Sequence, residues 1–183
     1  MRIHILGASG SGGTTQGQAL AARLRLPYFD SDDYFWLQTE PPFRQRRDAA
    51  ARNHLLRADL DQAGQWVLGG SVINWGEGVL PRFDLVVFLY LAPAVRLSRI
   101  RAREEARYGD SIYTDPGRAA QFEAFMAWAA DYDAQTGIAN RTLQAHRDWL
   151  AGLRSPVLEL IGDLPTAVRV QRIVETLTAD SCC

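Results

Sequence analysis

The segment 7–15 contains the residues of this chain that are best suited to bind phosphate. It reads Gly7, Ala8, Ser9, Gly10, Ser11, Gly12, Gly13, Thr14 and Thr15, and it directly follows the largely apolar run 3–6. A glycine-rich turn between a strand and a helix directs backbone N–H groups into one concavity, and the helix dipole adds partial positive charge there. We therefore predict that all nine residues bind a nucleotide, with the Thr14 hydroxyl as a ligand of Mg²⁺.

One residue departs from the phosphate-loop pattern G-x-x-x-x-G-K-[ST], because Gly13 stands where the pattern has lysine. No lysine occurs anywhere in the chain, so all 20 basic residues are arginines. A side chain that donates to developing charge in a preorganised site contributes roughly 3–4 kcal/mol to the transition state. Either an arginine or a metal ion supplies the missing charge, or the site lacks it. Which of these holds separates a kinase from a protein that only binds nucleotide.

A run of arginines follows the fourth apolar segment of the chain. Arg96, Arg99, Arg103 and Arg107 are separated by three, four and four residues. On an α-helix this spacing places their side chains on one face. A stripe of like charge suggests a use such as binding triphosphate oxygens bidentately, and Arg99, Arg103 and Arg107 are the catalytic candidates because they approach a candidate lid. The alternative is a solvated face on which neighbouring glutamates pair with arginines.

Three carboxylates, those of Asp30, Asp32 and Asp33, occur within four residues after the second strand-like segment. In an open parallel sheet, ligands bind outside the carboxyl ends of the strands, which places this cluster beside segment 7–15. Carboxylates there hold Mg²⁺ or accept a proton from an attacking hydroxyl. The alternative is that one of the three caps the following helix and that the others are solvated.

A second polar turn follows the third strand-like segment. Residues 66–71 end in two glycines and a serine, and Trp75 follows them closely. We take Gly70 and Trp75, together with Asp32 and Asp33, as candidates for the wall of a pocket that binds the acceptor molecule. A turn with a buried tryptophan explains the segment equally well.

Short apolar runs alternate with longer helical patterns along the chain, as in repeated βαβ units with a parallel sheet. We expect strands at residues 2–6, 27–29, 66–69, 84–91 and 157–160. Helices are expected at residues 14–24, 47–63, 93–108, 116–133, 140–153 and 165–178. The predicted fold is a three-layer α/β fold with about five parallel strands flanked by helices. Residues 1–183 form a single domain in it, and residues 104–135 form a small helical insertion that includes the candidate lid.

Composition narrows the class of protein. With 183 residues and 47% hydrophobic content, the chain is long enough for one well-buried domain and short for two. A net charge of −1 gives no broad attraction to nucleic acid or to an anionic membrane. No apolar stretch approaches the roughly 20 residues that span a bilayer, and no signal-peptide pattern is visible, so a cytoplasmic protein is expected. Cys182 and Cys183 provide neither a disulfide framework nor metal-ligand spacing.

Together these segments resemble the P-loop kinases of the adenylate, shikimate and gluconate kinase group. Within that group the chain is most similar to bacterial adenylate-kinase-related proteins, some of which are called topology modulators. The resemblance is carried by residues 3–15, by Phe29-Asp30-Ser31-Asp32, by Gly69-Gly70, and by residues 86–91 with the arginine-rich helix after them. These stretches occur in the expected order over most of the chain, and only the first is a specific motif.

The resemblance implies roles for individual residues. Segment 7–15 would wrap the β- and γ-phosphates of ATP or GTP, with Thr14 on Mg²⁺. The Asp30-Ser31-Asp32 run is similar to the Asp-Ser-Asp of shikimate kinases, which implies that Asp30 serves the metal and that Asp32 meets the acceptor hydroxyl. Arg99 and Arg103 resemble the arginines that precede the lid in nucleoside monophosphate kinases. The chain departs from the group at Gly13 and in a lid without a cysteine cluster or an arginine pair.

We therefore expect a Mg²⁺-dependent kinase that transfers the γ-phosphoryl group of ATP or GTP to a small-molecule acceptor. The alternative is a nucleotide-binding regulator or scaffold that uses the same loop and turns over weakly or not at all. Neither hypothesis involves nucleic acid or a membrane. The oligomeric state stays open, with a homodimer as one option.

Overall fold

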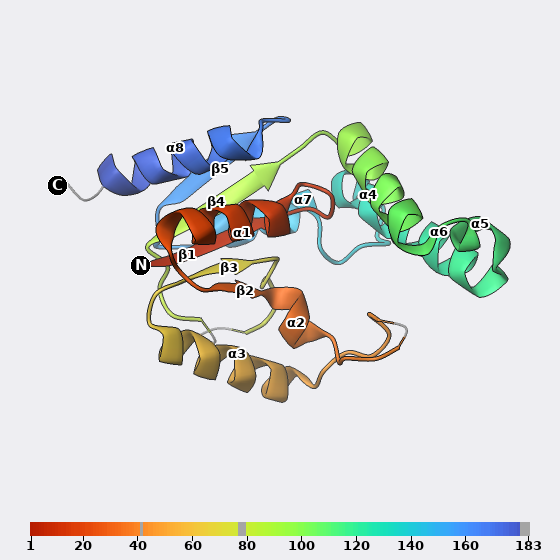
Figure 1. The fold of residues 1–183 in the computed structure, drawn as a ribbon, viewed down its shortest axis with the longest axis horizontal. Helices are drawn as coiled ribbons and strands as arrows, with labels where there is room; N and C mark the ends of the chain where they lie inside the picture. Colours follow the sequence, from red (N-terminus) through yellow and green to blue (C-terminus); the bar gives the residue numbers. More distant parts are fainter. Residues whose placement is uncertain (41, 77–79, 180–183) are drawn as a thin grey trace.

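Five parallel strands form one sheet in the computed structural model, which describes residues 1–40, 42–76 and 80–179 (Figure 1). The strands are β1 (Arg2–Gly7), β2 (Tyr28–Asp30), β3 (Trp66–Gly69), β4 (Leu85–Tyr90) and β5 (Val157–Ile161). They lie in the order β2-β3-β1-β4-β5, and every pairing is parallel. The predicted α/β fold is confirmed, and β1 is its central strand. Cys182 and Cys183 lie outside the described residues.

Helices cover both faces of the sheet and extend beyond one end of it (Figure 1). They are α1 (Gly13–Leu24), α2 (Ser31–Phe35), α3 (Ala49–Ala63), α4 (Pro93–Tyr108), α5 (Ser111–Thr114), α6 (Pro116–Ala134), α7 (Leu143–Ala151) and α8 (Thr166–Ala179). Figure 1 shows α1 and α8 on one face, α3 on the other, and α4, α5 and α6 projecting from the end. Only α2 and α5 were not predicted, because five and four residues are too few for a helical period. No helix in the described ranges is long and apolar enough to cross a membrane.

The core consists of two hydrophobic clusters, one on each face of the sheet. Because successive side chains of a strand point to opposite faces, Ile3 and Ile5 of β1 join the cluster under α1 and α8. Leu6 of the same strand joins the cluster under α3 and α7. Full burial of each such side chain contributes about 1.5–3 kcal/mol. Both clusters reach the carboxyl ends of the strands, so they fix the position of the loops that follow.

Local signals in the sequence explain where the helices at the projecting end begin. Pro93 and Pro116 occupy the first turns of α4 and α6, where the missing N–H of proline costs no hydrogen bond. The Asp115 side chain caps α6 by accepting a hydrogen bond from the backbone N–H of Arg118 at 2.7 Å. A cap of this kind contributes about 1 kcal/mol.

Arg96, near the start of α4, is fully buried and joins three parts of the chain. Its guanidinium donates hydrogen bonds to the Leu91 carbonyl at 3.2 Å and to the Ser9 carbonyl at 3.1 Å. It also forms an ion pair with Asp133 of α6. The first member of the predicted arginine stripe is therefore a structural residue, because α6 and segment 7–15, hereafter the glycine loop, pack against the first turns of α4.

Replacing Arg96 with methionine should destabilise the fold by about 3 kcal/mol, because Asp133 would keep a largely buried charge without its partner. Urea unfolding followed by circular dichroism measures the loss. Arg101→Met is the matched control, since Arg101 is an exposed arginine on the same helix. We expect this control to change the free energy of unfolding by less than about 0.5 kcal/mol. Equal stability of the two variants would contradict the structural role of Arg96.

Two histidines are buried and neutral. His4 is fully buried in β1, with Nδ1 3.1 Å from the Leu68 carbonyl oxygen. Burial lowers the pKa of His4 to about 4, and burial likewise lowers the pKa of His146 in α7 to about 3. Histidines of the unfolded chain bind a proton near pH ~6.5, whereas these two do not until the pH is lower. The free energy of unfolding should therefore fall as the pH drops from about 6.5 towards 4.

The His4→Met variant should show a weaker fall of stability between pH values of about 7 and 4.5 than the wild-type protein, because one buried neutral histidine is removed. Urea titrations at several pH values measure the slope. Gln62→Met, at an exposed position of α3, is the control and should keep the wild-type slope. If His4→Met is as steep as the wild type, His4 does not contribute to the pH dependence.

Candidate functional site

A cavity of about 830 Å³ opens at the carboxyl edge of the sheet. Its described lining includes the whole glycine loop together with Asp30, Asp32, Gly70 and Ser71. The lining also includes five arginines, namely Arg99, Arg103, Arg107, Arg141 and Arg169. The structure thus brings together most of the candidate residues, although they come from segments that lie far apart in the sequence.

The glycine loop joins β1 to α1 without a side-chain cap. Gly12 is the N-cap residue of α1 in a left-handed conformation, with φ 92° and ψ 21°, and no side chain hydrogen-bonds to the helix start. The Ser11 N–H donates to the Ala8 carbonyl at 3.0 Å, which closes a turn within the loop. The first N–H groups of a helix have no partner inside it. Together with the positive end of the helix dipole, they are suited to bind an anion.

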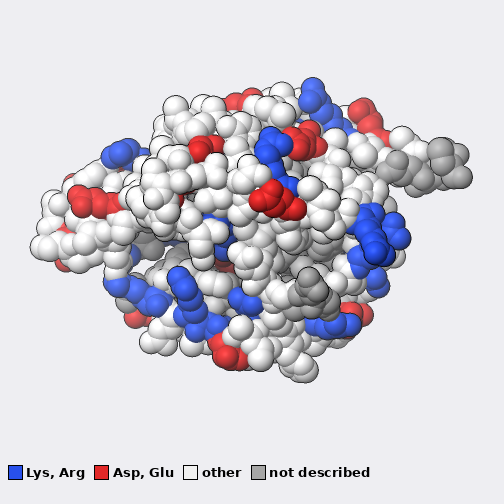
Figure 2. Space-filling model, turned by 180° about the vertical axis from the view of Figure 1, so that it is seen from behind, with Lys and Arg blue, Asp and Glu red and all other residues white. Residues whose placement is uncertain are grey.

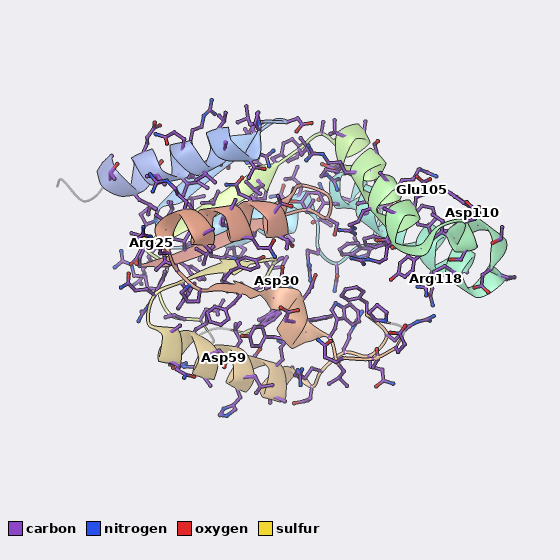
Figure 3. The ribbon with its side chains drawn as sticks, in the orientation of Figure 1. Arg25, Asp30, Asp59, Glu105, Asp110 and Arg118 are labelled. Carbon is purple, nitrogen blue, oxygen red and sulfur yellow. The ribbon has the colours of Figure 1, made fainter. Side chains whose placement is uncertain are left out.

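Thr14 and Asp30, the two candidate metal ligands, are in direct contact. The Thr14 hydroxyl donates to Asp30 Oδ2 at 3.0 Å, and the Tyr28 hydroxyl donates to the same oxygen at 2.8 Å. Figure 3 shows Asp30 at the end of β2, between α1 and α2. Its other oxygen accepts a hydrogen bond from the Asp32 N–H at 3.1 Å, so one aspartate of the cluster does cap the following helix.

A hydroxyl beside a carboxylate fits the chemistry of Mg²⁺. This ion prefers oxygen ligands and commonly takes only one or two protein groups, with phosphate and water completing its shell. The described residues contain no group of three or more histidines, cysteines, aspartates or glutamates that could hold a metal by themselves. A magnesium site here would accordingly be shared between Thr14, Asp30 and a bound phosphate.

Gly70 allows this close arrangement at the end of β3. Its φ is +87°, a left-handed conformation that side chains disfavour. A Cβ atom on Gly70 would collide with the Ser31 hydroxyl and would lie 3.4 Å from Asp30 Oδ1. The glycine therefore permits the ends of β2 and β3 to meet beside the cavity.

Asp32 lies in the cavity beside this pair. Burial raises the pKa of its carboxyl, the charge of Asp30 raises it further, and Arg141 and Arg103 oppose the change. A carboxylate with a raised pKa is a better proton acceptor than an ordinary aspartate. Asp33 also has a raised pKa, owing to burial and then to Asp30, but it is not among the described residues of the lining.

The cavity arginines of α4 are held by aromatic rings and by two acids, because Arg99 pairs with Asp163 and Arg103 pairs with Glu104 at 3.3 Å. The Arg103 guanidinium lies 5.8 Å from the centre of the Phe125 ring, and that of Arg107 lies 5.7 Å from the Phe43 ring. Arg99 forms an ion pair with Asp163 at 2.6 Å. Rings orient a guanidinium by cation–π contact without neutralising it.

The cavity carries an excess of positive charge. Its described lining holds the five arginines named above against three aspartates, Asp30, Asp32 and Asp163. Figure 2, which views the molecule from behind, shows basic side chains around a hollow between the projecting α4–α6 end and the body of the molecule. A concave site of this charge favours an anionic ligand such as a polyphosphate.

Two lining arginines were not singled out from the sequence. Arg141 lies in the loop between α6 and α7, with its guanidinium 5.9 Å from the centre of the Trp128 ring. Arg169 lies on α8, one turn after the Gly162–Pro165 turn that follows β5. A signal for Arg169 existed, because the carboxyl end of every strand in a parallel sheet reaches the same edge. Arg141 has no local pattern of this kind.

A buried hydrogen-bonded chain fixes the Ser71 hydroxyl at the cavity wall. The Ser71 Oγ lies 2.9 Å from His146 Nε2, and the Tyr132 hydroxyl lies 2.8 Å from His146 Nδ1. Burial, and then the charge of Arg141, lower the pKa of His146, so its imidazole is neutral. A neutral imidazole donates from one nitrogen and accepts at the other, so the two hydrogen bonds of His146 run in one direction.

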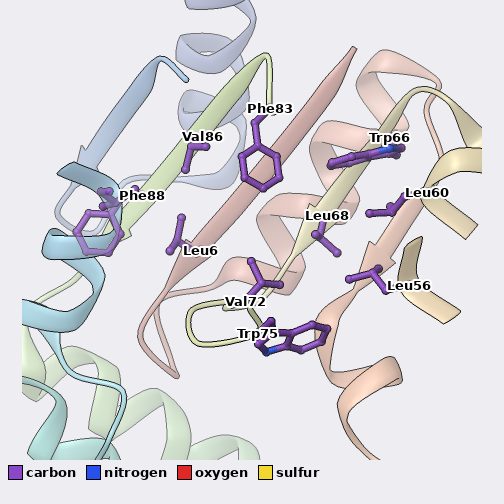
Figure 4. Close-up of a cluster of buried hydrophobic side chains, with 11 residues drawn as sticks. Leu6, Leu56, Leu60, Trp66, Leu68, Val72, Trp75, Phe83, Val86 and Phe88 are labelled. Atoms are coloured by element: carbon purple, nitrogen blue, oxygen red, sulfur yellow. The ribbon is translucent and has the colours of Figure 1, made fainter. Parts of the chain in front are cut away.

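Trp75 packs in the core and is not among the described residues of the cavity lining. It is 6% exposed and belongs to the hydrophobic cluster of Figure 4, where it lies near Val72 and Leu56. The Arg52 guanidinium stands over its ring at 3.9 Å from the centre. The alternative interpretation of this segment, a turn with a buried tryptophan, agrees with its position in the structure.

Comparison with known proteins gives relatives over the whole chain and over part of it. No protein-family model matches the chain. The "Uncharacterized protein YqaC" of Bacillus subtilis (strain 168) is 39% identical over 178 residues, which cover 97% of this chain and 98% of that protein. A shikimate kinase of Bacteroides fragilis is 32% identical over 120 residues, which cover 58% of this chain and 65% of that enzyme.

Solved kinase structures share the fold. Shikimate kinase from Aquifex aeolicus matches with a TM-score of 0.55 at 18% identity, covering 100% of this chain and 99% of that chain. Deoxyadenosine kinase from M. mycoides matches with a TM-score of 0.57 at 15% identity, covering 98% of this chain and 100% of that chain. These matches confirm the resemblance to the P-loop kinases at the level of the fold. The chain has the P-loop kinase fold, and its near-complete match to YqaC shows that it belongs to the YqaC family.

Proposed function

We propose that the protein transfers the γ-phosphoryl group of ATP or GTP to a hydroxyl group of a small molecule, with Mg²⁺ as cofactor. The observation that carries this proposal is the hydrogen bond between Thr14 and Asp30, which sets two oxygen ligands side by side at the first turn of α1. Asp32 and the arginines of α4 line the same cavity. An anion cradle, metal ligands, a proton acceptor and cations are thus collected in one site.

In this proposal, different residues of the site perform different parts of phosphoryl transfer. The glycine loop binds the β- and γ-phosphates through backbone N–H groups. When bound, Mg²⁺ would neutralise charge on the transferred group, and Thr14 and Asp30 would hold it. Asp32 accepts the proton of the attacking hydroxyl, a role that its raised pKa favours. Arg99, Arg103 and Arg107 stabilise the charge on the phosphates, an effect that for one arginine reaches about 10³–10⁵ in rate.

In this proposal the acceptor binds beside Asp32, Gly70, Ser71 and Arg141, which all line the cavity. A carboxylate and a fixed hydroxyl suit a molecule that carries hydroxyl groups. The partial sequence similarity to a shikimate kinase supports a hydroxyl acceptor of this kind. Asp33 and Trp75, which do not line the described cavity, have no part in the proposed mechanism.

We further propose that residues 104–135, which include α5 and α6, form a lid over this cavity. The rings of Phe125 and Trp128 on α6 stand against the guanidiniums of Arg103 and Arg141. Movement of these rings would change the contacts that orient the two guanidiniums beside the phosphates. Closure of such a lid excludes water from the reaction.

The direct test is ADP formation from Mg·ATP, with and without a pooled panel of sugars, hydroxy acids and nucleoside monophosphates. Acceptor-stimulated ADP formation supports the kinase and allows the pool to be divided until the acceptor is found. Nucleotide binding without any stimulated turnover would favour the alternative, a regulator that uses the same loop. Absence of both binding and turnover would overturn the proposal.

Thr14→Ala should weaken the binding of Mg²⁺, because one of two protein ligands is lost. The half-saturating Mg²⁺ concentration for turnover should rise about tenfold or more. A magnesium titration at saturating nucleotide measures the effect. Thr178→Ala, at an exposed position of α8, is the control and should match the wild type. An unchanged Mg²⁺ requirement in Thr14→Ala would remove Thr14 from the metal site.

Arg103→Ala should reduce turnover by about a hundredfold or more while changing the Kd of the nucleotide by less than about threefold, because the proposed contact strengthens as charge develops. Steady-state kinetics and equilibrium binding separate the two quantities. Arg101→Ala, on the same helix, should leave both near the wild-type values. A wild-type rate in Arg103→Ala would refute its assigned role.

A further inference from the structure

The space beside Gly13 is open, whereas two cations lie beside the neighbouring Gly12. A Cβ atom on Gly13 would meet no heavy atom within 4 Å. A Cβ atom on Gly12 would instead lie 3.6 Å from Arg169 Nη1 and 3.9 Å from Arg99 Nη1. Two guanidinium groups, from α8 and from α4, therefore converge beside the residue that precedes the missing lysine.

Arg169 is buried, and its hydrogen-bond partners among the described residues are neutral carbonyl groups. It is 3% exposed, and it donates from Nη1 to the Ser11 carbonyl at 3.1 Å and from Nη2 to the Gly162 carbonyl at 2.8 Å. Both partners are neutral, and its Nε has no hydrogen-bond partner in the described part of the chain. Buried charges are ordinarily paired. An arginine held only by carbonyl groups thus indicates that an anion completes its environment.

Arg99 does not balance that charge, because it is itself a cation. Its one ion pair among the described residues is with Asp163, and both side chains of this pair are about half exposed, at 42% and 50%. Burial lowers the pKa of Arg169 and the charge of Asp163 opposes this change, so two guanidiniums share a single carboxylate beside the glycine loop. Like charges so close to each other are unfavourable unless a negative group lies near both of them.

The bond from Arg169 to Ser11 also acts on the loop backbone. The carbonyl of Ser11 and the N–H of Gly12 belong to one planar trans peptide, so they point in opposite directions. A cation that holds the carbonyl fixes the direction of this N–H, and it polarises the peptide so that the N–H donates more strongly. Arg169 is thus placed to act on a bound phosphate through the loop, while Arg99 lies at its rim.

We propose that Arg169 and Arg99 together supply the positive charge that a lysine at position 13 would bring to the triphosphate. Arg99 binds the phosphates, and Arg169 is a positioning residue that also contributes its charge. This inference rests on the proposed function, because it assumes that the glycine loop binds a nucleoside triphosphate. It explains how a chain without lysine can keep a working phosphate loop.

The test is a double-mutant cycle between Arg169→Met and Gly13→Lys, read out as equilibrium binding of Mg·ATP by calorimetry. Arg169→Met should weaken binding about tenfold or more, as expected for the loss of a charged hydrogen-bonding group. Gly13→Lys should restore most of that loss in the Arg169→Met background, since the space at position 13 is open. In the wild-type background the same lysine should gain less than about threefold, because the charge is already present.

The cycle separates an electrostatic role from a purely structural one. A lysine at position 13 cannot replace the bonds to the Ser11 and Gly162 carbonyls, so a loss of binding that arises only from a displaced loop would not be rescued. Arg172→Met, an exposed arginine on the same helix, should bind like the wild type. Thermal unfolding of each variant reports whether it is folded. If Arg169→Met does not fold, the same cycle with Arg99→Met tests the pair, because Arg99 is partly exposed.

Four results would overturn the inference, and they point to different causes. Unchanged binding in folded Arg169→Met and Arg99→Met, with a wild type that binds, would reject the arginine pair and leave the proposed function intact. Equal gains from Gly13→Lys in both backgrounds, or no rescue in either cycle, would show that lysine and arginine do not perform the same task. A wild type that binds no Mg·ATP would reject the proposed function together with this inference.

Discussion

Two buried guanidinium groups hold the carbonyls of the glycine loop, and the rest of the site depends on this contact. Arg96 of α4 binds the Ser9 carbonyl, and Arg169 of α8 binds the Ser11 carbonyl. Because each carbonyl points opposite to the N–H of its own peptide, these bonds set the directions of the N–H groups of Gly10 and Gly12. Two helices that follow the neighbouring strands β4 and β5 thereby orient a loop that has no side-chain cap of its own.

The same arrangement explains how the site collects charge without lysine. Lysine would place one flexible point charge inside the concavity, whereas each arginine here is oriented by a carbonyl, a ring or a carboxylate. Arg103 and Arg107 stand over aromatic rings, and Asp30 serves as the opposite pole by contacting Thr14 and capping α2. Positive and negative groups are therefore collected in one cavity, as a magnesium-bound polyphosphate and a hydroxyl acceptor would require.

Much of this arrangement could be predicted from local patterns, and the remainder could not for physical reasons. The glycine loop, the carboxylates after β2 and the arginine spacing on α4 are local signals, because the residues of each signal lie close together in the sequence. The partners of Arg96 and Arg169 are distant in sequence, and no helical or strand period marks a bond from a guanidinium to a carbonyl. Trp75 shows a second limit of prediction from sequence, since a tryptophan in a glycine-rich turn is compatible with a pocket wall and with the core.

We propose that the cavity above the glycine loop binds a nucleoside triphosphate together with its metal ion. A crystal structure with Mg²⁺ and a non-hydrolysable ATP analogue tests this most directly. We expect the β- and γ-phosphates on the N–H groups of the glycine loop, the metal beside Thr14 and Asp30, and Arg99 on the phosphates. A nucleotide bound elsewhere, or a metal that contacts neither Thr14 nor Asp30, would contradict it.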